Sequence, residues 1–282
     1  MNVSTRFAPS PTGRLHPGHA FSAIMAHDFA RERDGRFLLR IEDIDGTRSR
    51  PEHVETILRD LEWLGLGWDG EVVFQSQRLA SYQAALDRLR GMGLLYPCFC
   101  TRADIAASLT APHGPEGAIY PGTCRNLDAP DLSKPHCWRL DMAKALAASG
   151  SESLSFHDSR HGLIHADPTQ HGDVVLARKD APASYHLAVT LDDAAQGITD
   201  IVRGDDLLAA THVHRLLQAL LGLPTPRYHH HALLLGPDGE RLAKRHGAPT
   251  LAALRESGAD GRAFAEALRR GELPVGFAAA KA

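Results

Sequence analysis

The stretch at residues 6–20, Arg-Phe-Ala-Pro-Ser-Pro-Thr-Gly-Arg-Leu-His-Pro-Gly-His-Ala, limits the possible folds more than any other part of the chain. Val3 and Phe7 indicate that a buried strand ends at its start, and apolar residues at helical spacing follow it to about residue 33. Its three prolines stiffen the connecting loop, and its two glycines let a ligand approach the backbone. The N–H groups at the start of the helix make this loop a natural phosphate site, which His16 and His19 face.

A second strand is predicted at residues 36–41, so the chain begins with a strand, a helix and a strand. This order predicts a parallel unit of a doubly wound α/β sheet, in which ligands bind beyond the carboxyl ends of the strands. Glu42, Asp43 and Asp45 directly follow the second strand, and this position favours a functional role over that of a solvated turn. Further strands are predicted at residues 72–74, 198–207 and 228–235.

The composition is that of a globular protein without an overall basic surface, with a formal charge of −3 and 43% hydrophobic residues. A polyanion would therefore have to bind a local patch of positive charge. No apolar run reaches about eighteen residues, which argues against a membrane span. The opening motif begins too early to leave room for a signal peptide. We expect a cytoplasmic monomer that does not contact a membrane.

The pattern changes at residues 96–178, where short alternating segments and a loop rich in proline and glycine replace the parallel pattern. We predict that this segment is an α+β insertion domain. It contains the four cysteines of the chain, and thiols in a chain without an export signal suggest a metal site more than disulfides. Three thiolates and one further ligand would suit a closed, tetrahedral structural zinc site.

The fourth ligand of such a site stays open from spacing alone. Tyr120 lies near the third cysteine of the series Cys98, Cys100 and Cys124, but tyrosine is a rare ligand because its phenol has a pKa of about 10. Buried thiols without a metal are the simpler alternative. The other candidates for the fourth ligand are His113, His136 and Cys137.

A run of three histidines, residues 229–231, lies in the last predicted strand and invites a metal interpretation. Consecutive residues of a strand point to opposite faces, so the three side chains cannot converge on one ion. We interpret them as structural or as neighbours of a nucleotide.

Three motifs resemble those of a known enzyme family. The sequence Pro-Ser-Pro-Thr-Gly followed by Leu-His-x-Gly-His, at residues 9–19, resembles the HIGH signature of class I aminoacyl-tRNA synthetases of the glutamyl and glutaminyl group. The stretch Arg-Ile-Glu-Asp-x-Asp at residues 40–45 matches glutamyl-tRNA synthetases. Arg-Leu-Ala-Lys-Arg at residues 241–245 resembles their KMSKS loop, with arginine in place of the first lysine and last serine, and Ala243 in place of the other serine.

The resemblance implies activation of an amino acid by ATP with Mg²⁺, in which a carboxylate attacks the α-phosphate. This chemistry needs positioning and stabilisation of negative charge, and no protein nucleophile. His16, His19 and the flexible cation Lys244 are the implied catalytic residues. The implied ATP-binding residues are His16, Gly18, His19 and Lys244.

The resemblance also implies a pocket for L-glutamate. Arg6 and Arg203 suit the two carboxylates because a guanidinium fork can bind both oxygens of a carboxylate, and Glu42 suits the ammonium group. Which arginine binds which carboxylate stays open. The implied glutamate-binding residues are Arg6, Phe7, Ala8, Pro9, Ser10, Glu42, Tyr185 and Arg203. The implied ligands of one structural zinc ion are Cys98, Cys100, Tyr120 and Cys124.

The expected architecture is a Rossmann-type doubly wound parallel sheet split by a zinc-containing α+β insertion domain, with a short helical C-terminal segment. Residues 1–95 and 179–240 would form the two halves of the catalytic fold, residues 96–178 the zinc-binding insertion domain, and residues 241–282 the KMSKS-like loop and a helical tail. We expect no anticodon-binding domain, because few residues follow the lysine loop.

A stand-alone catalytic half is the form of the glutamyl-queuosine tRNA(Asp) synthetase family, and the chain resembles that family in this respect. The resemblance implies transfer of activated glutamate to the queuosine base in the anticodon loop of tRNA(Asp). We expect phosphate contacts to the tRNA from arginines of the insertion domain and the tail, including Arg245, Arg255 and Arg262. One alternative is a truncated glutamyl-tRNA synthetase that charges a tRNA 3′ end. The other is a catalytically silent RNA-binding paralogue, against which the intact set of implied site residues argues.

Overall fold

The opening strand, loop and helix form as the sequence predicts. They are β1 (Ser4–Phe7), a connecting loop and α1 (Pro17–Arg31), and β2 (Arg36–Ile41) pairs with β1 in parallel. A row of buried alanines lets α1 pack closely against the two strands, whose apolar side chains are also buried. The structure is a computed structural model, and it describes residues 2–107, 113–114, 117–150, 153–235, 249–272 and 278–279.

The parallel sheet reverses its order of winding between β1 and β11 (Asp200–Gly204). On one side of β1 lie β2 and then β3 (Val73–Phe74), reached through α2 (Pro51–Trp63). On the other side the Thr199 N–H donates to the Ser4 carbonyl at 3.0 Å, which joins β1 to the start of β11. The resulting order is β3–β2–β1–β11–β12, and such a switch point places a ligand crevice at the carboxyl ends of β1 and β11.

The second half of the sheet contains β11 and β12 (Arg227–His231), which pair in parallel across α7 (Leu208–Leu221). Gly222 ends α7 in the left-handed conformation at φ 64°, as its place after the last apolar residue predicts. A hairpin of β8 (Ser155–Asp158) and β9 (Gly162–His165) continues the sheet beyond β12, with β8 parallel to it. This hairpin belongs to the predicted insertion segment by sequence, but it pairs with the catalytic sheet.

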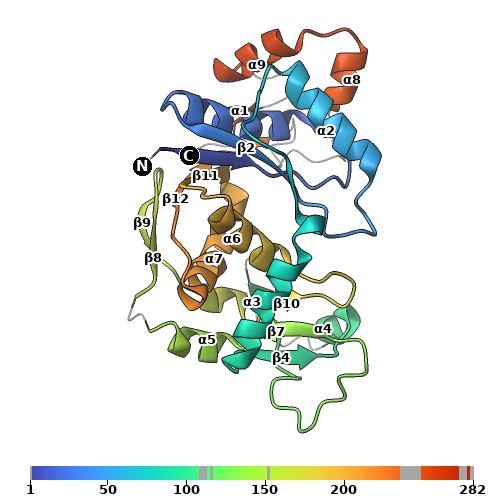
Figure 1. Cartoon of the computed structure of the whole chain (residues 1–282), viewed down its shortest axis with the longest axis vertical. Helices are drawn as coiled ribbons and strands as arrows, with labels where there is room; N and C mark the ends of the chain where they lie inside the picture. Colours follow the sequence, from blue (N-terminus) through green and yellow to red (C-terminus); the bar gives the residue numbers. More distant parts are fainter. Residues whose placement is uncertain are drawn as a thin grey trace.

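The rest of the predicted insertion centres on a small antiparallel sheet with the strand order β10–β7–β4. It lies at the opposite end of the molecule's long axis from the C-terminal helices α8 (Leu251–Glu256) and α9 (Gly261–Arg269) (Figure 1). The strands are β4 (Leu95–Cys98), β7 (Cys137–Leu140) and β10 (Val175–Ala177). The short elements of this region are α4 (Arg102–Ala107), β5 (His113–Gly114), β6 (Gly117–Ala118), α5 (Met142–Ala148) and the 3-10 turn η2 (Pro168–His171).

One hydrophobic cluster connects this small sheet with α3 (Leu79–Gly91), α6 (Tyr185–Ala195) and α7. It contains Leu86, Leu140, Leu187 and Leu216, all buried. The predicted insertion is therefore packed onto the helices of the catalytic half, and its proposed bounds at 96 and 178 stay a prediction. The remaining described elements are the 3-10 turns η1 (Gln75–Gln77) and η3 (Asp205–Leu207) and the pair β13 (Leu234–Leu235) and β14 (Ala278–Ala279).

The C-terminal helices cover the first half of the sheet, with α8 on α2 and α9 on α1. Arg255 of α8 places its Nε 3.3 Å from Oδ1 of Asp60, whose side chain is fully buried. Burial raises the pKa of Asp60, and the guanidinium opposes that shift. This contact gives Arg255 a structural role, and its predicted phosphate contact stays a prediction. None of the described helices is both long enough and apolar enough to cross a membrane.

Candidate active site

A cavity of about 690 Å³ opens where the switch point of the sheet predicts a ligand. All eight predicted glutamate-binding residues lie on its wall, together with His16, Gly18 and His19. The structure therefore brings these predicted residues together around one cavity, and their roles stay a prediction. Lys244 lies outside the described residues. The other residues that line the cavity are Thr12, Gly13, Arg14, Leu15, Phe21, Ser22, Val189, Gly204, Asp206, Leu207, His231, Leu233 and Leu234.

The two histidines of the opening motif form the N-terminal cap of α1. Nδ1 of His16 accepts from the Gly18 N–H at 3.1 Å, and the His16 N–H donates to Nδ1 of His19 at 3.2 Å. Because each Nδ1 accepts a hydrogen bond, the proton of each neutral ring is on Nε2. Both rings line the cavity as donors at the positive end of a 15-residue helix, an arrangement that favours a bound phosphate.

A buried carboxylate, Asp193 of α6, holds two arginines at the base of the cavity. It accepts from Arg6 Nε at 2.9 Å and from Arg40 NH1 at 2.8 Å, and Arg40 is fully buried. Burial by itself would raise the pKa of Asp193, but the two guanidinium groups outweigh it and hold this pKa below its usual value. Arg6 is thus fixed in place before any substrate binds.

Glu42 lies at the same end of the cavity, with Oε1 3.4 Å from NH2 of Arg40. Burial raises its pKa, although Arg40 and Arg6 act in the opposite direction. A ligand ammonium beside this carboxyl would favour its ionised form. The position therefore suits the predicted partner of the glutamate amino group.

The neighbouring acid, Asp192, is also buried and connects α6 with the segment after β3. It accepts from Gln75 Nε2 at 2.8 Å, from Arg78 Nε at 2.6 Å and from the Tyr82 hydroxyl at 2.8 Å. Sequence reasoning assigned no role to Arg40, Asp192 or Asp193. The available signal was their place among apolar residues of a strand and a helix, because charged side chains are rarely buried unless they are paired.

Arg203, at the end of β11, also lines the cavity. Its NH1 lies 3.3 Å from the Tyr185 hydroxyl, and its NH2 donates to Thr211 Oγ1 at 2.6 Å. Tyr185 is 37% exposed, while the arginine is buried. Arg6 and Arg203 come from adjacent strands and face one cavity, so both can bind carboxylates of one small ligand.

The three consecutive histidines of β12 alternate as predicted. His229 bonds Asp200 at 2.8 Å and His231 bonds Ser22 Oγ at 3.0 Å, with their rings against phenylalanines of α1. His230 points to the other face, where it contacts Asp158. His229 and His230 thus make structural contacts, and His231 lines the cavity. That one of them neighbours a nucleotide stays a prediction.

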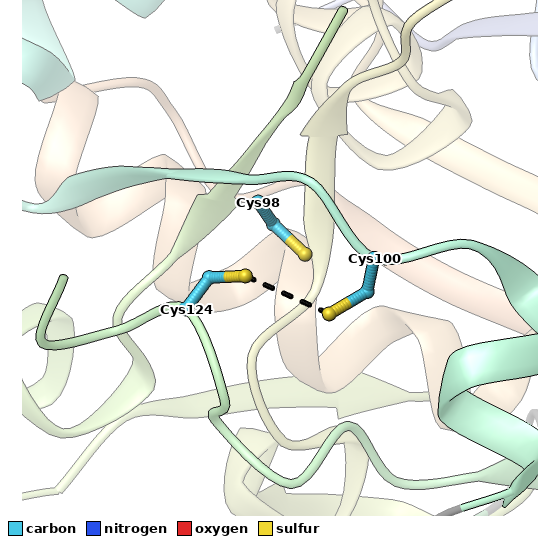
Figure 2. A group of neighbouring side chains, drawn as sticks. All are labelled: Cys98, Cys100 and Cys124. Carbon is cyan, nitrogen blue, oxygen red and sulfur yellow. Dashed lines mark hydrogen bonds between the residues drawn. The ribbon is translucent and has the colours of Figure 1, made fainter. Parts of the chain in front are cut away.

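A separate cluster of thiols lies in the small antiparallel sheet and the loop beside it. The sulfur atoms of Cys98, Cys100 and Cys124 all lie within 4.8 Å of one another, and those of Cys100 and Cys124 are 3.6 Å apart (Figure 2). Tetrahedral zinc with Zn–S bonds of about 2.3 Å places its sulfur ligands about 3.8 Å apart. The spacing of the three thiols therefore fits zinc.

The candidates for the fourth ligand differ in position. The Tyr120 hydroxyl is 3.5 Å from Cys100 Sγ and accepts from the Cys124 N–H at 2.9 Å. Burial raises the pKa of this phenol, so the metal itself would have to favour the phenolate. Cys137 Sγ instead contacts the Cys98 carbonyl at 3.5 Å, and His136 bonds the Lys134 carbonyl. Among the candidates whose side chains are described, Tyr120 thus interacts with all three thiols, whereas Cys137 interacts with the thiol of Cys98.

The chain matches the family model of class I tRNA synthetases (E and Q), catalytic domain, over residues 2–277. It is 50% identical over 269 residues to a glutamyl-Q tRNA(Asp) synthetase of Rhodobacter capsulatus, which covers 90% of this chain and 95% of that relative. A second protein of that name, from Nocardia farcinica, is 49% identical over 253 residues, covering 90% of this chain and 79% of the relative. The crystal structure of a glutamate-tRNA synthetase from Elizabethkingia anophelis superimposes with a TM-score of 0.77 at 27% identity, over 94% of this chain and 60% of that one.

Proposed function

The chain belongs to the class I tRNA synthetases of the E and Q group and is a ligase of the glutamyl-tRNA synthetase type, and we propose that it activates L-glutamate with ATP and transfers it to queuosine in tRNA(Asp). This acceptor is supported by the 50% identity to a relative that is named a glutamyl-Q tRNA(Asp) synthetase. The chain covers 95% of that relative. The observation that supports the amino acid is a cavity whose wall carries the buried arginines Arg6 and Arg203 together with the carboxyl group of Glu42.

In the proposed mechanism, Arg6 and Arg203 bind the carboxylates of glutamate and Glu42 binds its ammonium group. The α-carboxylate then attacks the α-phosphate of ATP, a glutamyl-adenylate forms, and pyrophosphate leaves. Because Arg6 is already held by Asp193, little reorganisation is needed when the substrate binds, and this preorganisation favours the reaction.

The phosphates of ATP are proposed to bind at the start of α1, against His16, Gly18 and His19. Donors there stabilise the charge that develops on the pentavalent phosphorus and on pyrophosphate. Lys244 is proposed to supply a cation from the opposite side. Mg²⁺ enters as part of the ATP substrate and neutralises phosphate charge when bound.

The second step transfers the glutamyl group to the acceptor. A hydroxyl of the cyclopentene diol of queuosine attacks the adenylate carbonyl, an ester forms, and AMP leaves with the electron pair of the broken C–O bond. The bases of an anticodon loop are unpaired, so a protein can bind a base that is turned out of the stack. The proposed phosphate contacts are Arg255, Arg262 and Arg245, the last of which lies outside the described residues.

The acceptor is tested with radiolabelled glutamate and two forms of tRNA(Asp), one with queuosine and one with guanosine at that position. We expect glutamate on the queuosine form only, and we expect transfer to persist when the 3′-terminal adenosine is removed. Removal of that adenosine also serves as the control, because it abolishes charging at a 3′ end. Equal labelling of both forms, or labelling of tRNA(Glu) at its 3′ end, would instead support a truncated glutamyl-tRNA synthetase.

We propose further that Cys98, Cys100, Tyr120 and Cys124 hold one structural zinc ion, and that residues 96–178 are the insertion domain that it stabilises. Support comes from the thiol spacing and from the position of the phenol beside it. Zinc with four protein ligands leaves no open position, so its contribution is to fix β4 and the loop that carries Cys124.

Elemental analysis of the purified chain is expected to find one zinc ion per molecule. Cys100→Ser is expected to lose the metal and to destabilise the region around β4, because a hydroxyl is a poor substitute for a thiolate. Cys137→Ser is the matched control, since this buried thiol lies in the same sheet outside the proposed ligand set. Retention of zinc by Cys100→Ser, or loss from Cys137→Ser, would contradict the ligand set.

A further inference from the structure

A chain of buried polar contacts leads from the β8–β9 hairpin to the wall of the cavity. Asp158 Oδ2 lies 2.7 Å from His230 Nδ1, and His230 Nε2 lies 3.1 Å from Arg203 Nε. The side chains of Asp158 and His230 are both 0% exposed. Neither residue lines the cavity, and this series of contacts links Asp158 to a ligand in the cavity through the imidazole of His230 and the guanidinium of Arg203.

Asp158 accepts a hydrogen bond in each of its contacts. Its Oδ1 accepts from the backbone N–H groups of Arg160 and His161 at 2.9 and 3.0 Å, and its Oδ2 also accepts from the His230 N–H at 3.1 Å. These donors favour the ionised form, and they hold the pKa of Asp158 below its usual value against the effect of burial. The carboxylate therefore determines which ring nitrogen of His230 carries the proton.

The tautomer of the imidazole follows from its two partners. Both partners require the same tautomer: the ionised Asp158 accepts the proton of Nδ1, and Arg203, which can only donate, needs Nε2 as an acceptor. Burial, and the nearby cation of Arg203, lower the pKa of His230 to about 4, so the ring is neutral at physiological pH. A second contact of Nε2 with Thr211 Oγ1, at 3.4 Å, lies on the same side.

The guanidinium of Arg203 is consequently held at every nitrogen. Nε bonds the imidazole, NH1 the Tyr185 hydroxyl, and NH2 both Thr211 Oγ1 and the Leu207 carbonyl. Of these partners, the imidazole can be reversed from acceptor to donor by a change of tautomer. A ring that presented an N–H to Arg203 would place two donors against each other and turn the guanidinium away.

We propose that Asp158 and His230 are positioning residues for substrate recognition: Asp158 selects the imidazole tautomer, and the imidazole sets the direction in which Arg203 presents its guanidinium to a substrate carboxylate. The inference rests on the proposed function, since it takes glutamate as the ligand of Arg203. It assigns no contact with substrate to either residue.

The kinetic test is glutamate-dependent exchange between ATP and pyrophosphate. His230→Leu keeps a similar volume but removes the acceptor, and we expect its KM for glutamate to rise about 10- to 100-fold, because a hydrogen bond to a charged group is lost. The KM for ATP should stay within about twofold of the parent value, because the lost hydrogen bond orients Arg203, which binds glutamate in the proposed function. His230→Gln can offer its amide oxygen where Nε2 lies, and it should recover most of the loss.

The matched control is His229→Leu. His229 is the preceding residue of β12 and also bonds an aspartate, Asp200, but it does not line the cavity or contact Arg203. Its variant should leave the KM for glutamate unchanged. An unchanged KM in His230→Leu, or an equal rise in His229→Leu, would overturn the proposal.

The tautomer is measured separately from activity, by ¹⁵N NMR of the histidine rings in the full chain. The parent is expected to show His230 protonated at Nδ1, and Asp158→Asn should move the proton to Nε2, because an amide can donate to Nδ1. A parent ring protonated at Nε2 would overturn the inference even if a leucine variant failed to fold. A parent enzyme that shows this tautomer but no exchange with glutamate would instead contradict the proposed function alone.

Discussion

Replacement of Asp193 by alanine is expected to lower the free energy of unfolding by about 3–5 kcal/mol, because it leaves two guanidinium groups buried without their shared carboxylate. Asp193 accepts from both Arg6 and Arg40, and Arg40 has no exposed surface. Glutamate activation should be lost as well, since Arg6 would no longer be held in the cavity. Urea denaturation and exchange between ATP and pyrophosphate are the two measurements.

Asp87→Ala is the control for this variant. Asp87 forms an ion pair with Arg90 at 2.9 Å, but the two side chains are 48% and 52% exposed. Exposed pairs of this kind contribute about 0–1 kcal/mol, so the variant should remain close to the parent. A similar loss in the free energy of unfolding in both variants would contradict the contribution to stability that we assign to the buried network.

The stabilisation by Asp193 also has a defined pH dependence. Its pKa in the folded chain is lowered, so the contribution is present above the pKa of the unfolded state. It is lost as the pH falls through the lower, folded-state pKa. The difference in stability between the parent and Asp193→Ala should therefore be largest near neutral pH and shrink in acid.

Discrimination between glutamate and glutamine is expected to be the largest kinetic effect, with kcat/KM about 10⁴- to 10⁵-fold lower for glutamine. Glutamine has a neutral side chain whose amide N–H₂ group would face guanidinium donors. A buried arginine would then lose a charged acceptor, and such a loss is costly in a site shielded from water. The proposal of a glutamate pocket rests on Arg6 and Arg203, which are both buried.

The measurement is exchange between ATP and pyrophosphate with each amino acid in turn. Arg203→Lys serves as the comparison, because a lysine keeps the charge but loses the planar fork. This variant should weaken glutamate activation strongly. It should also reduce the ratio of kcat/KM for glutamate to kcat/KM for glutamine. Equal kcat/KM values in the parent would rule out a pocket in which arginine selects the substrate.

The sequence alone determined the local elements and the general position of the site. The prolines and glycines of residues 6–20 predicted a loop between a strand and a helix, and that loop does line the cavity. Helical spacing and the glycine after residue 221 predicted the bounds of α7. These signals depend on residues that are neighbours in the chain, so they can be recognised without knowledge of the fold.

The partners of the buried charges, by contrast, were decided by the tertiary structure. Asp193 lies 187 residues from Arg6 and 153 from Arg40, and Asp158 lies 72 residues from His230. The chain contains 31 basic and 34 acidic residues, so composition and spacing offer too many possible pairs. The pairing of the β8–β9 hairpin with β12 could not be predicted from the sequence either, although it places Asp158 beside the imidazole of His230. A charge can remain buried only where packing brings an opposite charge or a hydrogen-bond partner to it, and that packing exists only after the distant segments have folded together.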